Sequence, residues 1–334
     1  MNAKNVYRNL IKLVLTAIVP VFLLSCERIK DDMDDCGVFL EFVYDYNMDY
    51  TDYFDPQVEM IDIFVFDDQE RYLFTRHARR EELTVGNRMF LGEDLRFGHY
   101  KILTVGGLTD HFGVADKEGN AFSPGQTMLE DVRIALTRAA GTISHELSPL
   151  WVGKTIDVDY KADLSVWRVD LVKNTNRFDV SLVDVNRSGG VRDGTAIYSF
   201  GIETPEGAIY SHNNDPLVKE TVIYTPYYLA EGNEPGELSE GLVNTVRLMY
   251  GEGTDYKLFV YDTRTGQQLW NYDLMELLEE MKKSSQPGNS LSMQEFLDRQ
   301  SEWQLKVLYK DEGGFVAIAV IVNGWIVRID DIGV

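Results

Sequence analysis

Few residues in this sequence have the type and spacing that chemistry needs, and the clearest of them is Cys26. It follows Leu23, Leu24 and Ser25 at the end of an apolar run that begins at Leu13, and basic residues stand ahead of this run at positions 4, 8 and 12. The run is too short to cross a membrane comfortably but has the length of an export-signal core. A thiol directly after such a core is placed for acylation.

The segment Leu23-Leu24-Ser25-Cys26 resembles the bacterial lipobox, in which the cysteine is diacylated and the signal is cut just before it. We therefore predict cleavage between Ser25 and Cys26, so that residues 1–25 are a lipoprotein signal peptide. Cys26 would carry a diacylglycerol and an N-acyl chain, and no other cofactor is expected. Each acyl chain adds about 0.8 kcal/mol per buried CH₂, and two or more give stable anchoring. The alternative is an ordinary secretory signal cut near Ser25.

An acidic tether at residues 26–36 follows the predicted cleavage point. Within it, Lys30, Asp31 and Asp32 resemble the acidic export tag that directs lipoproteins of Bacteroides-type bacteria to the outer face of the outer membrane. An acidic segment is also typical of a solvated linker. We expect a lipid-anchored, surface-exposed protein of the outer membrane. With Cys26 acylated, Cys36 has no partner within the chain, so it is a free thiol or pairs between molecules, and a cysteine metal site is excluded.

Outside this segment the catalytic inventory is sparse, and we expect neither an enzyme nor a metal site. There is no nucleophile elbow, phosphate-binding loop or dinucleotide fingerprint. Asp184, Asn186, Ser188 and Asp193 partly match a calcium loop but lack its terminal glutamate. Two carboxylates facing each other across a cleft remain the catalytic arrangement that sequence does not exclude. The five histidines are scattered singly, at His77, His99, His111, His145 and His212.

Aromatic and acidic residues alternate densely between Tyr44 and Asp55. Such a mixture has two interpretations. Its aromatics can plug the end of a β-sandwich, which we favour, or its rings and carboxylates can stack on a sugar and hydrogen-bond to it. The second interpretation requires Tyr46, Tyr50 and Tyr53 to cluster on one exposed face.

Charge excludes one class of partner. The 334 residues include 32 Lys and Arg against 54 Asp and Glu, a net charge of −22. Loss of residues 1–25 removes three basic residues and leaves 29, so the mature charge is −25. Phosphate backbones bind basic surfaces, so we expect no nucleic acid partner. The hydrophobic content of 44% is sufficient for two cores.

Most of the mature chain has the two-residue periodicity of strands. Residues 37–173 contain seven or eight short strand patterns and no convincing helix, which is typical of a β-sandwich. A polar break at residues 173–176 precedes a second series, so we place a second sandwich at 174–334. The expected strands in the first are 38–46, 61–65, 71–74, 84–91, 100–105, 129–136, 154–160 and 166–172, and in the second 178–183, 197–203, 221–229, 242–250, 256–260 and 268–270.

Two short helices interrupt the second series. Asp273 with Glu276, and Ser292 with Glu295, have the spacing of capping boxes at helix starts. The first helix should pack on the sandwich through an apolar face made of Leu274, Leu277, Leu278 and Met281.

The end of the chain is the most strongly patterned part. Residues 303–309 alternate as a half-exposed strand, whereas residues 315–322 are apolar throughout, which predicts a strand covered on both faces. Asn323-Gly324 predicts a type I′ turn into a returning strand at 325–329. We expect no further strand after it.

Taken in order, these features resemble the fimbrillin-associated fimbrium anchor (FimB-like) family of Bacteroides-type bacteria. The resemblance covers nearly the whole mature chain. Its motifs are Cys26 and Cys36, the strand at 38–46 with Asn47 and Phe54, the hairpin at 61–67, Gly98-His99-Tyr100-Lys101, the 262–266 hairpin ending at Asp273-Leu274, and Val322-Asn323-Gly324-Trp325.

The resemblance implies two tandem transthyretin-like β-sandwiches and a role as membrane-proximal anchor of a cell-surface fimbrium. Its partners would be fimbrial structural subunits, joined by strand exchange, and the anchor would accept a strand without donating one. An incomplete sandwich exposes unpaired N–H and C=O groups that an added strand satisfies. The alternative is a surface lipoprotein that binds glycan or another host ligand.

Overall fold

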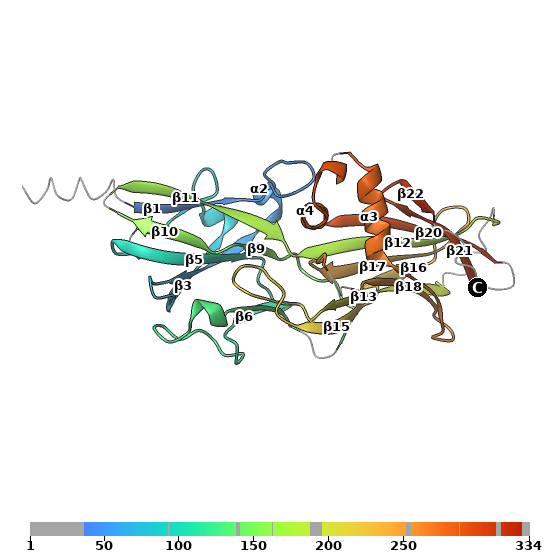
Figure 1. The fold of residues 1–334 in the computed structure, drawn as a ribbon, viewed down its shortest axis with the longest axis horizontal. Coiled ribbons are helices and arrows are strands. Elements are labelled where there is room, and N and C mark those ends of the chain that lie inside the picture. Colours follow the sequence, from blue (N-terminus) through green and yellow to red (C-terminus); the bar gives the residue numbers. More distant parts are fainter. Residues whose placement is uncertain are drawn as a thin grey trace, which may run out of the picture.

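The computed structural model describes residues 37–328 apart from positions 93, 138–140, 162, 188–195, 252–254, 287 and 312–314. Strands dominate the described residues, which confirms the predicted all-β fold. The long axis runs from β1 (Gly37–Val43) at one end toward the strands of the C-terminal half at the other (Figure 1). No helix in the described part of the chain has the length and apolar character to cross a membrane.

The described strands form four sheets. The first contains β1 with β2 (Met60–Phe66), β3 (Tyr72–Arg79), β4 (Arg88–Phe90), β5 (Gly98–Gly106), β9 (Trp151–Gly153), β10 (Ile156–Tyr160) and β11 (Leu164–Lys173). The second, six-stranded sheet has the order β16 (Tyr228–Ala230), β17 (Glu237–Val246), β12 (Thr175–Asp184), β20 (Glu302–Asp311), β21 (Phe315–Val322) and β22 (Trp325–Arg328).

The two smaller sheets join segments that are far apart in sequence. The five-stranded sheet has the order β19 (Gln268–Asp273), β18 (Lys257–Asp262), β13 (Tyr198–Glu206), β15 (Lys219–Tyr224) and β8 (Thr142–Ile143). The last sheet contains β14 (Ile209–Tyr210), β7 (Arg133–Leu136) and β6 (Phe112–Ala115). β7 and β8 precede residue 173 and pair with β14 and β15, which follow it. The domain boundary predicted at residues 173 and 174 stays a prediction.

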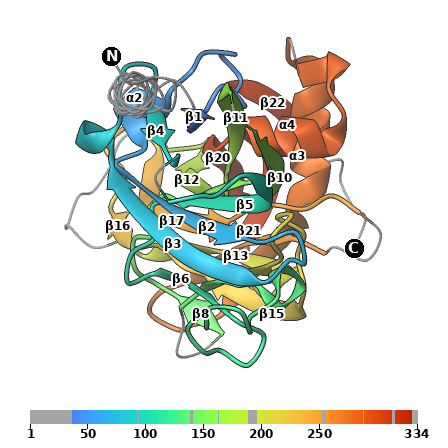
Figure 2. The same ribbon diagram turned by 90° about the vertical axis from the view of Figure 1, so that its left-hand side faces the viewer.

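Strand β2 separates two cores. Ile61, Ile63 and Val65 on one face pack with the inner residues of β1 and β11, whereas Phe64 and Phe66 on the other face join the core that contains β6 and β7. Figure 2, which looks at the β1 end, shows β2 between β1 and β6. The sequence predicted the hairpin of β2 with β3, and the pairing confirms it. Burial on both faces explains why every residue from Ile61 to Phe66 is buried.

The predicted helices begin at their predicted caps. Asp273 accepts hydrogen bonds from the N–H groups of Met275 and Glu276 at the start of α3 (Leu274–Ser284). Ser292 accepts one from Glu295 at the start of α4 (Met293–Arg299). The predicted apolar face of α3 is buried and lies against β18, β21 and β22. One helix was not expected, the single turn α2 (Phe54–Gln57), and three 3₁₀ turns are η1 (Arg80–Glu82), η2 (Leu129–Asp131) and η3 (Gly288–Ser290).

The closing hairpin departs from the prediction in one respect. Asn323 and Gly324 have φ of 46° and 83°, as a type I′ turn requires. The prediction that β21 is covered on both faces is wrong, because Val316 is 38% exposed and the returning strand leaves Trp325 and Ile326 at 45% and 66%. One face of this apolar strand packs in the core, and the other face lies at the surface.

Trp303 is the largest fully buried side chain, and we expect its loss to be costly. Its ring stacks on Phe178 and meets Phe296 edge-on, and its Nε1–H donates to Asn176 Oδ1 at 3.1 Å. Trp303→Ala should lower the free energy of unfolding by about 3–5 kcal/mol through the cavity it leaves. Trp325→Ala, at a half-exposed position, should cost about 1 kcal/mol or less. Urea unfolding compares the two, and equal losses would contradict this account of the core.

Candidate docking site on the six-stranded sheet

The residues predicted for lipid attachment lie outside the described part of the chain. These are Ser25, Cys26 and the tag residues Lys30, Asp31 and Asp32, and all five stay predictions. Cys36 lies outside it too.

The segment that partly matches a calcium loop lies only partly within the described residues. Asn186 donates its backbone N–H to Asp184 Oδ1 at 2.9 Å, whereas Ser188 and Asp193 fall outside the described residues.

The histidines are less scattered than the sequence suggested. The rings of His111 and His145 lie 4.9 Å apart, and His111 Nδ1 accepts the N–H of Ser148 at 3.0 Å. His77 contacts the buried carboxylate of Asp62. Within the described residues no group of three or more His, Cys, Asp or Glu is placed to hold a metal ion.

The aromatic and acidic stretch holds helix α4 in place. The guanidinium of Arg299 lies over the Tyr46 ring at 4.1 Å and over the Tyr50 ring at 4.5 Å, a double cation–π contact. Arg299 also donates to the backbone oxygen of Asn47 at 3.2 Å and pairs with Glu295 at 3.0 Å. This arginine covers one face of each of the two tyrosine rings. The stretch therefore packs against helix α4, and the interpretation that its aromatics plug the end of a sandwich stays a prediction.

The outer face of the six-stranded sheet changes character from one edge to the other. The strand pairing aligns five outward positions in one row, in the order Glu240, Ser181, Lys306, Ile321 and Ile326. Side chains directly opposite each other on neighbouring strands interact. One side of this face is thus acidic and the other is apolar.

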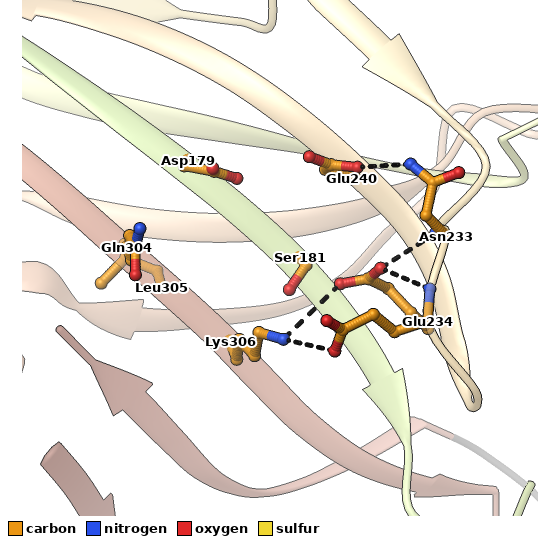
Figure 3. Close-up of a pocket in the computed structure, with 9 residues that line it drawn as sticks. Asp179, Ser181, Asn233, Glu234, Glu240, Gln304, Leu305 and Lys306 are labelled. Carbon is orange, nitrogen blue, oxygen red and sulfur yellow. Dashed lines mark hydrogen bonds and ion pairs between the residues drawn. The ribbon is translucent and has the colours of Figure 1, made fainter. Parts of the chain in front are cut away.

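The acidic side surrounds a hollow of about 330 Å³. Lys306 reaches across it, with Nζ 3.1 Å from Glu234 and 4.0 Å from Glu237 (Figure 3). Four carboxylates therefore face one amine, so the hollow is negative. Its lining residues are Asp179, Ser181, Asn233, Glu234, Glu237, Glu240, Gln304, Leu305 and Lys306.

The loop over this hollow is fixed by Glu237. Its carboxylate accepts the backbone N–H groups of Asn233 and Glu234 at 3.0 and 3.1 Å. Gly236 has φ of 81° and lies so close to two backbone oxygens that a Cβ would come within 2.9 Å of them. Only glycine fits there without strain. The hollow is therefore formed before any partner arrives.

The apolar side ends at β22, the edge strand. In the described part of the chain β22 pairs with β21 and with no other strand. Trp325 and Ile326 are both exposed on this edge strand. An edge strand of this kind is where another chain adds as a strand. Sequence reasoning missed these residues, although the unbroken apolar run before Asn323-Gly324 was the signal that could have indicated them.

A second cavity, of about 420 Å³, lies beside β10 and β11 of the first sheet and is closed by α4 and the segment that follows β17. Its wall includes the ion pair of Arg247 with Asp298, whose atoms approach to 2.7 and 2.8 Å and which is largely buried. The other lining residues are Asp45, Tyr46, Lys154, Ile156, Arg168, Asp170, Val172 and Asn214.

Comparison with known proteins places the chain among fimbrial proteins. The model of the family described as fimbrillin-A associated anchor proteins Mfa1 and Mfa2 matches residues 33–331. A candidate adhesin from Bacteroides ovatus is 36% identical, with a TM-score of 0.81, over 89% of this chain and 96% of that one. A candidate polysaccharide-binding protein from Bacteroides thetaiotaomicron is 26% identical, with a TM-score of 0.76, over 89% and 99%.

The fimbrial anchor protein Mfa2 from Porphyromonas gingivalis shares the fold, with a TM-score of 0.66 at 15% identity over 87% of this chain and 98% of that one. No curated protein sequence matches the chain.

The buried carboxyl of Asp179 in the hollow predicts how the free energy of unfolding depends on pH. Burial raises the pKa of the Asp179 carboxyl, the charge of Arg177 opposes the rise, and that of Glu237 adds to it. A carboxyl with a raised folded-state pKa destabilises the fold increasingly as pH rises from the unfolded-state pKa to the folded-state pKa. Asp179→Asn should therefore be more stable than the wild type at pH 8, and this advantage should shrink as pH falls toward about 4.

Urea unfolding between those pH values measures the difference. Asp68→Asn, in an exposed turn, is the matched control for removal of one negative charge. An advantage of Asp179→Asn that stays constant with pH would refute the assignment to the buried carboxyl.

Proposed function

The chain belongs to the family of fimbrillin-A associated anchor proteins, and from this membership we propose that it is an outer-membrane lipoprotein that anchors a cell-surface fimbrium. Family membership supports a role at the cell surface in association with fimbriae, in a structural and not an enzymatic capacity. The lipid attachment and the mode of subunit binding are the parts that we add.

Attachment to the membrane would be through acyl chains on Cys26. Cleavage after Ser25 leaves this residue at the mature N-terminus, and Lys30, Asp31 and Asp32 then act as the signal for transfer to the outer face. Two or more acyl chains bind a bilayer stably, whereas one binds reversibly. An anchor under the pull of a filament needs the stable form.

Attachment to the fimbrium would be through strand addition at β22. The observation that carries this proposal is the edge strand with its exposed Trp325 and Ile326. A strand donated by the next subunit would pair with the outer backbone groups of β22, with its side chains packed beside Ile326 on the outer face and beside Trp325 on the opposite face. The acidic hollow lies three strands away, roughly 14 Å at strand spacing, so a basic group elsewhere on the incoming subunit would meet it.

A second candidate function is glycan binding by the cavity beside β10 and β11. Several charged side chains line it together with the Tyr46 ring, one face of which Arg299 covers. The Bacteroides thetaiotaomicron relative is described as a candidate polysaccharide-binding protein.

Loss of the acylation site gives the first test of the anchor. Cys26→Ala removes the thiol, so the protein should disappear from the outer-membrane fraction and fimbriae should be found in the medium. Immunoblots of cell fractions and of medium, with electron microscopy of cells, measure both. Cys36→Ser, which removes the other thiol, should leave attachment unchanged. Fimbriae that stay cell-bound with Cys26→Ala would refute the anchor proposal.

Charge at the edge strand gives the second test. Ile326→Asp places a carboxylate where a donated strand would pack, so fimbrial subunits co-purified from surface-labelled cells should fall by about tenfold or more, as expected for loss of an interface anchor residue. Val85→Asp changes an even more exposed apolar residue outside the site and should have no such effect.

Mass spectrometry of the co-purifying chains measures recovery and names the partner. Unchanged recovery with Ile326→Asp would place the docking site elsewhere. Recovery of the wild-type protein alone, without fimbrial subunits, would favour glycan binding.

A further inference from the structure

A patch of exposed apolar side chains lies at the end of the molecule opposite the six-stranded sheet. We define the proximal patch as Phe39, Phe90, Leu164 and Val166. Pairing of β1 with β4 and β11 sets Phe39 beside Phe90 and Val166, and Gly37 beside Leu164, on one outer face. Leu164 and Val166 are 57% and 45% exposed, and Phe90 is 38% exposed.

Two aromatic rings pack closely at the tip of the patch. The rings of Phe39 and Phe90 lie 4.9 Å apart. The Phe90 ring also covers Gly37, where a Cβ would come within 2.1 Å of it. A side chain at position 37 would therefore displace the ring. Phe97, 58% exposed, lies at the same end, because its neighbour Gly98 pairs with Tyr160 just before the turn into β11.

The apolar character of this face stops sharply along the strands. The next outward row contains Glu41, paired with Arg88 at 2.8 Å, and Arg168, which is aligned with Glu41. Arg168 also pairs with Asp45 at 2.7 Å. At about 3.3 Å per residue, the apolar rows at positions 37 and 39 extend roughly 7 Å along β1 before the Glu41 row begins, and the exposed residues Lys161 and Asp163 precede Leu164 at the tip. Interfacial segments bury their apolar face about 5–10 Å into a bilayer, so the two depths agree.

We propose that the proximal patch inserts into the outer leaflet of the membrane that holds the acyl anchor. This inference rests on the proposed function, because the lipid on Cys26 brings the patch to the bilayer. Gly37 is the eleventh residue after Cys26, so the intervening chain spans at most about 40 Å. The strand that emerges from this tether carries the patch at its first residues. The paired charges of the next row then lie at the level of the headgroups.

Insertion gives the anchor a fixed orientation. Acyl chains alone attach the protein through a tether and leave its long axis free to tilt. A second, rigid contact at the β1 end directs the long axis away from the membrane. The edge strand β22, in the half of the molecule away from β1, is then presented outward (Figure 1).

The test uses the full mature lipidated protein in phosphatidylcholine vesicles. A bimane probe is attached to Leu164→Cys, or to Val85→Cys as control, in a Cys36→Ser background. Val85 is 97% exposed in the turn before β4, beyond the Arg88 row and outside the patch. Brominated lipid should quench the probe at position 164 by about twofold or more, as expected for insertion to acyl depth, and should leave the probe at position 85 unchanged.

A second arm keeps the proposal testable if the label itself perturbs the patch. With the probe at Phe97→Cys, quenching should be lost when Leu164→Asp and Val166→Asp are added, although the protein still floats with the vesicles. Flotation without quenching at position 164 overturns the patch proposal and leaves acyl anchoring intact. Absence of flotation overturns acyl anchoring, and the insertion proposal with it. If the fluorescence of the probe changes with the density of protein on the vesicles and does not change with brominated lipid, a second copy of the protein covers the patch. That result also overturns the insertion proposal.

Discussion

One continuous segment of backbone, from Leu164 to Asp184, joins the two halves of the molecule. The rest of the structure depends on the buried residue between its two strands, Asn174. Asn174 stands between β11 and β12 and is fully buried. Its N–H donates to the oxygen of Leu150 at 2.7 Å, and its amide exchanges hydrogen bonds with Asn214 at 2.6 and 2.9 Å. A buried amide left unpaired costs about 1–3 kcal/mol, so the two residues hold each other in place.

Charged side chains hold the residues around the Asn174–Asn214 pair. Arg247 donates to the backbone oxygen of Asn214 and pairs with Asp298. A buried ion pair adds little net stability, but the loss of one partner leaves an uncompensated charge, so it strongly favours one arrangement. One residue further on, Arg299 stacks between Tyr46 and Tyr50. The β1 half and the helices before β20 are thereby fixed relative to each other.

The two ends of the long axis then differ in chemistry. The parallel pairings of β1 with β11 and of β12 with β20 each place a new strand beside the joining segment. The first sheet carries the proximal patch on β11 and the strands beyond it. The six-stranded sheet ends, beyond β20, in the exposed strand β22. The chain as a whole carries a net charge of −22, and a large net charge of one sign opposes non-specific association.

Local signals in the sequence were sufficient for most of the longer strands, the two hairpins, the helix starts at Asp273 and Ser292 and the turn at Asn323-Gly324, because each depends on neighbouring residues. The short strands β6, β8, β9 and β14 were not predicted, because each is defined by its pairing with a strand elsewhere in the chain. The lipid site at Cys26 is also a local motif, and it stays a prediction. The candidate docking row could not be predicted from the sequence, because it aligns five residues from five strands through pairing that no single segment specifies. For the same reason the sequence predicted two covered faces for Phe315–Val322. Only the tertiary structure decided which face of that strand is buried and that β22 lies at the edge.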